Sequence, residues 1–228
     1  MEMTLPRRYG GPRASANGGY ACGRLAAFVD ADAVEVTLRL PPPLERPLEV
    51  VRETGVVQLL DGDALVAEAR PGSVALDPPA PVAVPDARAA RERHVRGADE
   101  EFDECFVCGV REDGLEVRVG LVAGREPLHA APIVFDETAP EIVWAAIDCP
   151  GAYAVGTEGR GDIVLGRMTA RVERVPEVGE QCVVTAWPLG EDRRKLFAGT
   201  ALFGGDGELL ALARQVWIAP RGSRVSVE

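Results

Sequence analysis

Short stretches of the chain alternate hydrophobic with polar residues, which is the pattern of half-buried β-strands. The clearest stretch covers residues 34–40, VEVTLRL, and a run of prolines ends it. Asp-Gly pairs at 61–62 and 206–207 are typical of hairpin turns between such stretches. The same reasoning predicts strands at 48–54, 56–60 and 64–70 in the first half of the chain, and at 115–119, 127–133, 163–174, 181–187, 195–203 and 209–218 in the second half.

Helical patterns are fewer than strand patterns. Residues 20–29 place apolar side chains on one helical face, so they are predicted to form a helix after a glycine-rich loop. A second helix is predicted at 140–148, with Thr138 as its N-cap and Glu141 three residues later in capping-box spacing. A short helix is also predicted near 86–93.

The chain divides into two similar halves. We expect an N-terminal unit at 1–76, a Pro-, Ala- and charge-rich linker at 77–101, and a C-terminal unit at 102–228. Segments 65–70 and 209–214 share four of six residues, and each follows an Asp-Gly turn. An internal duplication explains this best, and chance similarity between Ala- and Leu-rich strands is the alternative.

Each half would consist of one helix followed by antiparallel strands. A lone helix can bury its apolar face only against the sheet, which should curl around it. Pairing the two sheets edge to edge would remove two exposed strand edges. The fold class is therefore predicted to be α+β, with two helix-wrapped antiparallel sheets in one chain.

Several short motifs resemble a known group of proteins. Asn17-Gly18-Gly19-Tyr20 is similar to the NGGY-type helix start of thioesterase-like tandem hotdog proteins. In the second half the resemblance lies in CFVCG at 105–109, DGL at 113–115, VWAAIDCPG at 143–151 and the Arg194-Lys195 pair. It covers nearly the whole chain except the linker. The chain thus resembles the thioesterase-like superfamily, as a bacterial protein with a double hotdog fold.

The resemblance implies an acyl-CoA or acyl-carrier-protein thioester as the ligand. We expect a thioesterase that hydrolyses the thioester with a positioned water. A non-catalytic acyl-thioester-binding protein is the alternative, because not every member of the superfamily is a catalyst. A purely structural or partner-binding module is a third hypothesis.

Thioester hydrolysis requires a polarised carbonyl, an aimed water and an apolar slot. Asn17 and Asp148 are the predicted catalytic residues, although Asn17 is also a typical N-cap and Asp148 could be a solvated helix end. Gly18, Gly19 and Tyr20 are predicted to bind substrate at the start of the first helix, where the glycines could equally make a tight turn. Asp136 and Glu137 precede the second helix and fit a surface or capping role better.

Other candidates concern the two ends of the substrate. Trp144 could line the bottom of an acyl-binding pocket, or simply be a core residue. Arg193, Arg194 and Lys195 form a tight basic cluster that could receive the phosphates of coenzyme A, or be a solvated hairpin loop.

The catalytic residue sets of related enzymes cannot be placed on this sequence with certainty. Tandem thioesterases of the superfamily generally use an Asp with Gln and Thr or Ser partners, and Gln181, Gln215, Thr169 and Thr200 are the candidates here. Hotdog dehydratases use a His with a carboxylate. His94 falls in the linker and His129 has no convincing partner, so dehydratase activity is disfavoured.

Cys105 and Cys108 have zinc-ligand spacing, and Cys149 and His129 could complete four ligands. Because a second CxxC is missing, reduced thiols are the favoured interpretation. No metal and no cofactor are predicted. Cys22 and Cys182 are expected to be buried small hydrophobic residues.

Composition narrows the function further. The 228 residues are 46% hydrophobic and 27% charged, which is ordinary for a globular protein. The net charge of −11 disfavours a nucleic-acid-binding surface. Two histidines exclude a three-His zinc site, and five cysteines make a disulfide framework improbable. No membrane span or signal peptide is predicted, so a cytoplasmic location is expected. Assembly of the chain into a homodimer is compatible with the fold.

Overall fold

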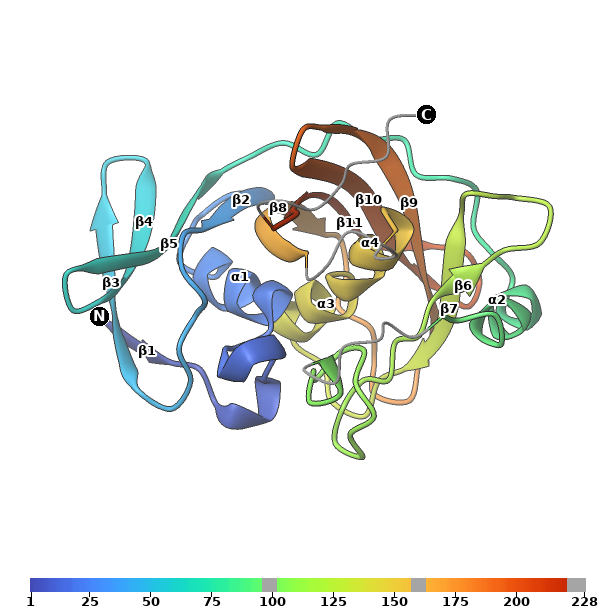
Figure 1. The fold of residues 1–228 in the computed structure, drawn as a ribbon, viewed down its shortest axis with the longest axis horizontal. Helices are drawn as coiled ribbons and strands as arrows, with labels where there is room; N and C mark the ends of the chain where they lie inside the picture. Colours follow the sequence, from blue (N-terminus) through green and yellow to red (C-terminus); the bar gives the residue numbers. More distant parts are fainter. Residues whose placement is uncertain (96–101, 157–162, 221–228) are drawn as a thin grey trace.

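The structure is a computed structural model that describes residues 1–95, 102–156 and 163–220. Eleven strands form one antiparallel sheet in the order β1-β3-β4-β5-β2-β8-β11-β10-β9-β7-β6 (Figure 1). The strands of the first half are β1 (Glu2–Thr4), β2 (Ala33–Leu38), β3 (Pro47–Glu53), β4 (Val56–Asp61) and β5 (Ala64–Pro71). Those of the second half are β6 (Gly120–Leu121), β7 (His129–Val134), β8 (Val164–Val172), β9 (Gln181–Asp192), β10 (Lys195–Gly204) and β11 (Leu209–Ile218).

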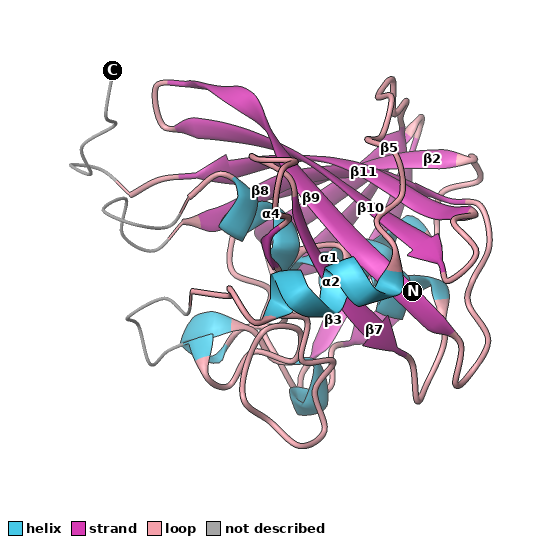
Figure 2. Cartoon of the chain, turned by 90° about the vertical axis from the view of Figure 1, so that its right-hand side faces the viewer, coloured by secondary structure: helices cyan, strands magenta, loops and turns pink. Residues whose placement is uncertain are grey.

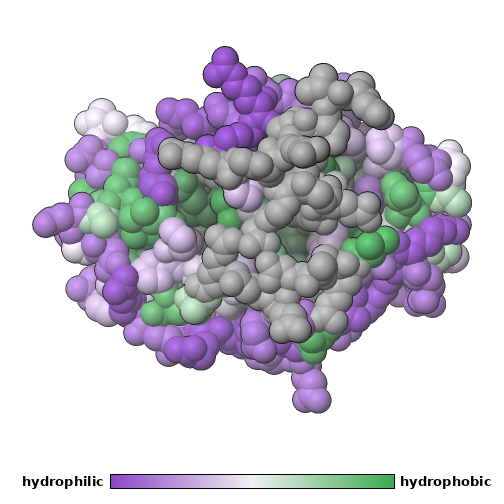
Figure 3. Space-filling view, in the orientation of Figure 1, coloured by the Kyte–Doolittle hydropathy of each residue, from purple (hydrophilic) through white to green (hydrophobic). Residues whose placement is uncertain are grey.

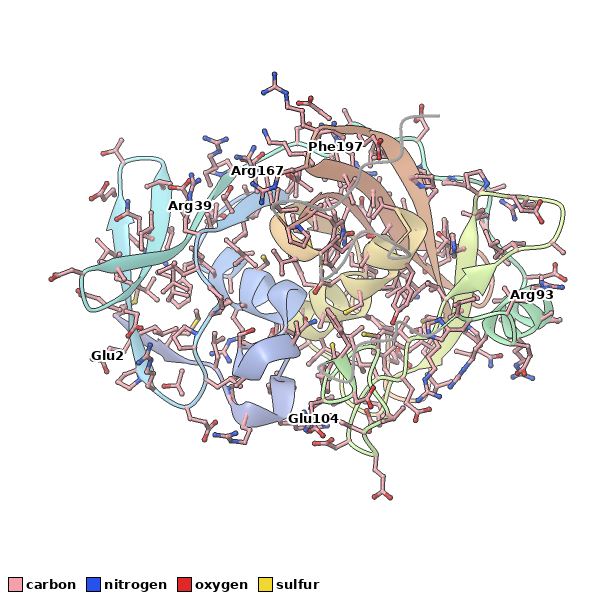
Figure 4. All side chains as sticks on the ribbon, viewed as in Figure 1. Glu2, Arg39, Arg93, Glu104, Arg167 and Phe197 are labelled. Atoms are coloured by element: carbon pink, nitrogen blue, oxygen red, sulfur yellow. The ribbon has the colours of Figure 1, made fainter. Side chains whose placement is uncertain are left out.

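The two halves meet where β2 pairs with β8. The register places Val34 opposite Ala170, and Arg167 Nε donates a hydrogen bond to Thr37 Oγ1 at 3.0 Å across this junction (Figure 4 labels Arg167). Outward from the junction the order is β2-β5-β4-β3-β1 on one side and β8-β11-β10-β9-β7 on the other. The expected edge-to-edge pairing is present. It joins the half-sheets into one continuous sheet, so the two separate sheets of the prediction are not seen.

Two helices lie side by side inside the curve of the sheet. They are α1 (Gly18–Ala26) and α3 (Pro140–Ala146), which Figure 1 shows next to each other, and Figure 2 shows α1 beneath β10 and β11. Glycines allow their close contact, because a Cβ on Gly19 would lie 2.5 Å from Asp148 Cβ and one on Gly23 would lie 2.7 Å from Glu141 Cα. Each half therefore buries its helix against both the sheet and the helix of the other half.

The main hydrophobic core fills the space between these helices and the inner face of the sheet. Alternate residues of each strand enter it, such as Leu196 and Leu202 of β10, as the strand period of two requires. Ala201 and Phe203 of the same strand face the opposite side, where they form a smaller cluster with Val74. The strand predicted at 195–203 is confirmed as β10, which is buried on both faces.

The linker also contributes to the packed structure. Its helix α2 (Val84–Arg91) is present close to where the sequence predicts it. Ala87 and Ala90 of α2 are buried beside Ala130 of β7, on the face of β7 opposite the main core. This segment therefore packs against the sheet and is not only a solvated connection. The last residues of the predicted linker, 96–101, lie outside the described residues.

Four features differ from the sequence-based expectation. Residues 115–119 are not a strand, and only β6 forms just after them. Helix α4 (Cys149–Ala154) and strand β1 were not predicted. The N-cap of α3 is Ala139 rather than Thr138, with no side-chain cap bond, because Pro140 begins the helix with a fixed φ and no N–H to satisfy.

The surface is polar around most of the rim of the face in Figure 3, with apolar patches toward the first half. A shallow cavity of about 210 Å³ lies between the end of α1 and β4, and Phe28, Val29 and Val57 line part of it. Within the described residues, no helix is both long and apolar enough to cross a membrane.

Candidate functional site

The structure brings Asn17 and Asp148 together at the contact between α1 and α3. Asn17 is the N-cap of α1, and its Oδ1 accepts a hydrogen bond from the Tyr20 backbone N–H at 2.8 Å. Its Nδ2 then points to Asp148 and donates to Oδ2 at 3.0 Å. The Gly19 backbone N–H donates to the same oxygen at 2.9 Å. Two donors from the first half therefore hold one carboxylate oxygen of the second half.

The other oxygen of this carboxylate has no partner. Asp148 is 2% exposed, and its Oδ1 is buried without a hydrogen bond among the described residues. Burial raises the pKa of Asp148 to about 7, against the opposing effect of the Gly19 N–H and the Asn17 amide. A buried carboxyl with a pKa near neutrality and one unpartnered oxygen can accept a proton at physiological pH.

The helix ends explain why a carboxylate is tolerated here. The sequence places Asp148 at the end of its own helix, where the dipole is unfavourable. In the structure the side chain lies at the N-terminus of α1, whose first N–H groups and positive dipole end favour an anion. The sequence suggested an unfavourable helix C-terminus around Asp148, whereas the structure places its carboxylate at the favourable N-terminus of α1.

A buried amide supports the backbone of Asp148. Gln215 of β11 donates from Nε2 to Ile147 O at 2.7 Å and to Asp148 O at 3.1 Å. Thr200 Oγ1 lies 3.5 Å from the same nitrogen, and Trp217 Nε1 donates to Gln215 Oε1 at 2.8 Å. Among the candidate Gln and Thr partners, Gln215 contacts the backbone of Asp148, and Thr200 contacts Gln215.

The remaining candidates of that set lie elsewhere. Thr169 pairs in register with Arg214 and Glu35, and its methyl group lies against Gly72. Gln181 begins β9, opposite Val134 of β7. Their sequence spacing carried no information about this, because the face of a strand residue and its neighbours depend on register.

The predicted substrate residues near α1 are close to the Asn17–Asp148 pair; Gly19 and Tyr20 are buried, and Gly18 is half-buried. Gly18 follows the N-cap directly, and a Cβ there would lie 3.0 Å from Leu165 Cδ2. Tyr20 stacks on Tyr9, with ring centroids 4.0 Å apart. Trp144 is buried against Gly23.

The basic cluster lies at the β9–β10 hairpin, away from this pair. Arg194 Nε donates to Ala219 O at 2.8 Å, and Lys195 pairs in register with Asp192. Thr200 is five residues further along β10 than Lys195, a separation of roughly 16 Å at the rise of a strand.

The acidic residues before α3 have the modest roles favoured by the sequence. Asp136 is exposed. Glu137 accepts hydrogen bonds from Arg8 and Tyr9 and forms an ion pair with Arg8 at 3.0 Å. It ties the N-terminal segment to the second half.

Three cysteines gather beside the pair. The Sγ atoms of Cys105, Cys108 and Cys149 all lie within 4.8 Å of one another, and those of Cys105 and Cys149 are 3.7 Å apart. Hydrogen bonds with Cys108 and Cys149 lower the pKa of Cys105 well below its ordinary value. Hydrogen bonds with Cys105 and Cys108, together with burial, raise the pKa of Cys149. Cys149 thus joins the CxxC pair, as the sequence allowed, whereas His129 does not belong to the group.

Both histidines form hydrogen bonds with backbone atoms. His94 Nδ1 lies 2.8 Å from Val119 O, and its ring contacts Tyr153. His129, the first residue of β7, has its Nδ1 3.1 Å from Pro127 O. Cys22 and Cys182 are buried thiols on α1 and β9, as predicted.

The likeness of this chain to known proteins lies in its structure. No family model matches the sequence, and no curated protein does. Solved structures match over nearly the full length. A Novosphingobium aromaticivorans protein provisionally described as a thioesterase has a TM-score of 0.68 at 16% identity, covering 96% of this chain and 94% of that one.

Two further structures show the range of activities that accompany this fold. Acyl-CoA thioesterase II TesB2 from Mycobacterium marinum has a TM-score of 0.57 at 13% identity, with 96% and 92% of the chains covered. The dehydratase domain of a mycocerosic acid synthase-like polyketide synthase has a TM-score of 0.59 at 15% identity, with 98% and 91% covered. At these identities the likeness concerns the fold. The chain therefore shares the fold of these proteins, which is a hotdog fold.

Proposed function

We propose that the protein hydrolyses an acyl thioester, carried by coenzyme A or an acyl carrier protein. The observation that carries this proposal is the carboxylate of Asp148, with Oδ2 held by Asn17 and Gly19 and Oδ1 buried without a partner. The fold shared with acyl-CoA thioesterase II TesB2 supports it. So does the motif resemblance, which covers both halves.

Asp148 would act as the general base. Its Oδ1 would accept a proton from a water as the water attacks the thioester carbonyl carbon. The carbon–sulfur bond would then break, and the proton held by Asp148 would pass to the leaving sulfur, which gives a thiol and a carboxylic acid. Asn17 can orient a water or the carboxylate but cannot take a proton. The fixed Oδ2 would keep Oδ1 in one orientation.

The N-terminus of α1 would polarise the thioester carbonyl. Gly18 is the first helical residue, so its N–H has no acceptor within the helix. This N–H and the positive dipole end would stabilise negative charge on the carbonyl oxygen. Gln215 and Thr200 would serve as positioning residues, because Gln215 holds the backbone of Ile147 and Asp148.

The rest of the substrate would extend in two directions. Trp144 and Tyr20, on the facing helices, would border the acyl chain. Arg193, Arg194 and Lys195 would contact the phosphates of the carrier, and the roughly 16 Å between Lys195 and Thr200 along β10 suits an extended carrier arm.

The duplicated architecture belongs to the same proposal. Residues 1–76 and 102–228 would be two hotdog units descended from one ancestor, joined by the linker at 77–101. The mirrored strand order on the two sides of the β2–β8 junction supports this. The similar segments 65–70 and 209–214 fall on β5 and β11, which occupy equivalent places. A homodimer of such chains is part of the proposal.

A second candidate function is binding of an acyl thioester without hydrolysis. One observation favours it: Asn17 and Asp148 are only 1% and 2% exposed, so a substrate must displace neighbouring groups to reach them. In that case the Asn17–Asp148 contact would hold the two halves together and the carboxylate would transfer no proton.

Free-thiol release from short, long and aromatic acyl-CoAs, together with acyl-carrier-protein counterparts, tests the proposal. Turnover of one acyl class well above the uncatalysed rate supports hydrolysis. A rise in melting temperature with acyl-CoA but no thiol release supports binding alone, because only a ligand of the native state stabilises it. Neither effect with any substrate would contradict both functions.

A further inference from the structure

We propose that Cys105, Cys108 and Cys149 form a binding site for a thiophilic divalent cation, with Zn²⁺ as the fitting ion. The proposal is independent of thioester hydrolysis, since it rests on the sulfur geometry. Two segments supply the ligands: the turn at 105–109 and the first residue of α4. The sequence pair alone did not favour a metal, and the third sulfur changes that assessment.

The distances suit a tetrahedral thiolate site. Zinc binds thiolate sulfur at about 2.3 Å, so two ligands at a tetrahedral angle lie about 3.8 Å apart. Cys105 Sγ and Cys149 Sγ are 3.7 Å apart, and all three sulfurs lie within 4.8 Å of one another. Small rotations of Cys108, which is partly exposed, would complete the third side of the site.

The turn that carries Cys105 and Cys108 is held by the backbone. The Gly109 N–H donates to Cys105 O at 2.9 Å, and a Cβ at Gly109 would lie only 2.3 Å from Asp103 O and 2.4 Å from Cys105 O. Phe106 N–H donates to Gly10 O at 2.8 Å. The pair of thiols is therefore preorganised on a tight, glycine-dependent turn.

N–H groups surround the sulfurs as the outer shell of a metal-bound thiolate does. The backbone N–H groups of Val107 and Cys108 point to Cys105 Sγ. Asn17 Nδ2 lies 3.7 Å from Cys149 Sγ and 3.9 Å from Cys105 Sγ. Such donors stabilise negative sulfur, and buried thiolates next to a carboxylate are stable when a cation offsets their charge.

The protein supplies three strong ligands to this site. Among the described residues no fourth cysteine or histidine belongs to the cluster, and the sequence has neither residue type at 96–101, 157–162 or 221–228. With these three sulfurs as its protein ligands, a tetrahedral ion would have a fourth position open to a solvent molecule, which is the arrangement of a zinc site with three protein ligands.

Titration of the reduced full-length protein with Co²⁺, followed by competition with Zn²⁺, tests the site. We expect thiolate-to-cobalt charge-transfer absorption that saturates at one ion per chain and disappears when Zn²⁺ is added. Single Cys105→Ser, Cys108→Ser and Cys149→Ser variants should bind Zn²⁺ at least tenfold more weakly. Cys182→Ser, which changes a buried thiol on β9, should leave the affinity unchanged.

Two controls keep the outcome decisive. A thiol count on the same sample must give the five reduced cysteines of the sequence, and the Cys108→Ser variant must keep the wild-type circular dichroism spectrum. Absence of charge-transfer absorption in fully reduced wild-type protein would overturn the proposal. Equal affinity of wild type and all three cluster variants would overturn it as well. Because the readout is metal binding, a protein with no thioesterase activity can still confirm the site.

Discussion

Asn17 Nδ2 lies 3.0 Å from Asp148 Oδ2, although 131 positions separate the two residues in the chain. This contact joins the first turn of α1 to the end of α3, and so joins the two halves at the point where the candidate chemistry is placed. Gly19 reinforces it, because its N–H donates to the same oxygen.

Gly19→Ala should destabilise the protein and disturb the site. The new Cβ would lie 2.5 Å from Asp148 Cβ and 2.6 Å from Trp144 O, so the helices must separate. We expect a loss of about 1–3 kcal/mol in the free energy of unfolding, measured by urea denaturation. Gly18→Ala is the matched control, because its nearest atom is the flexible Leu165 Cδ2 at 3.0 Å. Equal effects of the two substitutions would show that the close approach at Gly19 is unimportant.

Gln215→Ala should lower the free energy of unfolding by more than the loss of side-chain packing alone would. The variant leaves Ile147 O and Trp217 Nε1 without their partners in a buried region. Unsatisfied buried groups cost roughly 1–3 kcal/mol, and the new cavity adds to this. Gln58→Ala on β4 is a control at a half-buried position. A Gln215 variant as stable as the Gln58 variant would contradict the supporting role of the amide.

The carboxyl of Asp148 should make the stability of the protein fall as pH rises from its unfolded pKa of 3.8 to its folded pKa of about 7, and level off above that. Burial raises its pKa from 3.8 to about 7, so folding favours the protonated form. This contribution is fully present below the unfolded pKa and is lost as pH rises through the folded pKa. The difference corresponds to at most on the order of 4 kcal/mol.

Urea unfolding of wild type and Asp148→Asn between about pH 4 and pH 8 measures this term. Both proteins should be treated with chelator, so that no cation lies beside the carboxyl. Other carboxylates affect both proteins alike, and the difference between the two curves isolates Asp148. Parallel curves would mean that the pKa of Asp148 is not raised in the folded protein.

Local patterns predicted the parts of the fold that local physics determines. The strands predicted at 195–203 and 209–218 are present as β10 and β11, whose inner residues enter the core. The Asp206-Gly207 turn between them has the expected left-handed glycine, with φ of 89° at Gly207. The valine-rich stretch at 115–119 was misleading. Val117 and Val119 are buried there, but the segment is not part of a β-ladder. A buried loop segment and a buried strand can therefore show the same pattern of apolar residues in the sequence.

The site itself was only partly predictable. Asn17 and Asp148 were candidates from their positions at helix ends, but no local signal shows that they touch. Helix α4 was hidden because Pro150 suggests a loop, whereas proline is tolerated in the first turn of a helix. The assembly of Cys149 with the CxxC pair depends on the α3–α4 junction, so spacing along the chain could not reveal it.

The turnover of Asp148→Asn tests whether the Asp148 carboxylate takes the proton of the attacking water. Asparagine has nearly the same shape and can still accept hydrogen bonds from Asn17 and Gly19, but it cannot take a proton. With the best acyl-CoA substrate, we predict a fall in kcat/KM of about 10²–10⁴-fold at an unchanged fold. Asp136→Asn, at an exposed aspartate before α3, should keep wild-type turnover. Wild-type thiol release by Asp148→Asn would contradict the assignment of Asp148 as the general base.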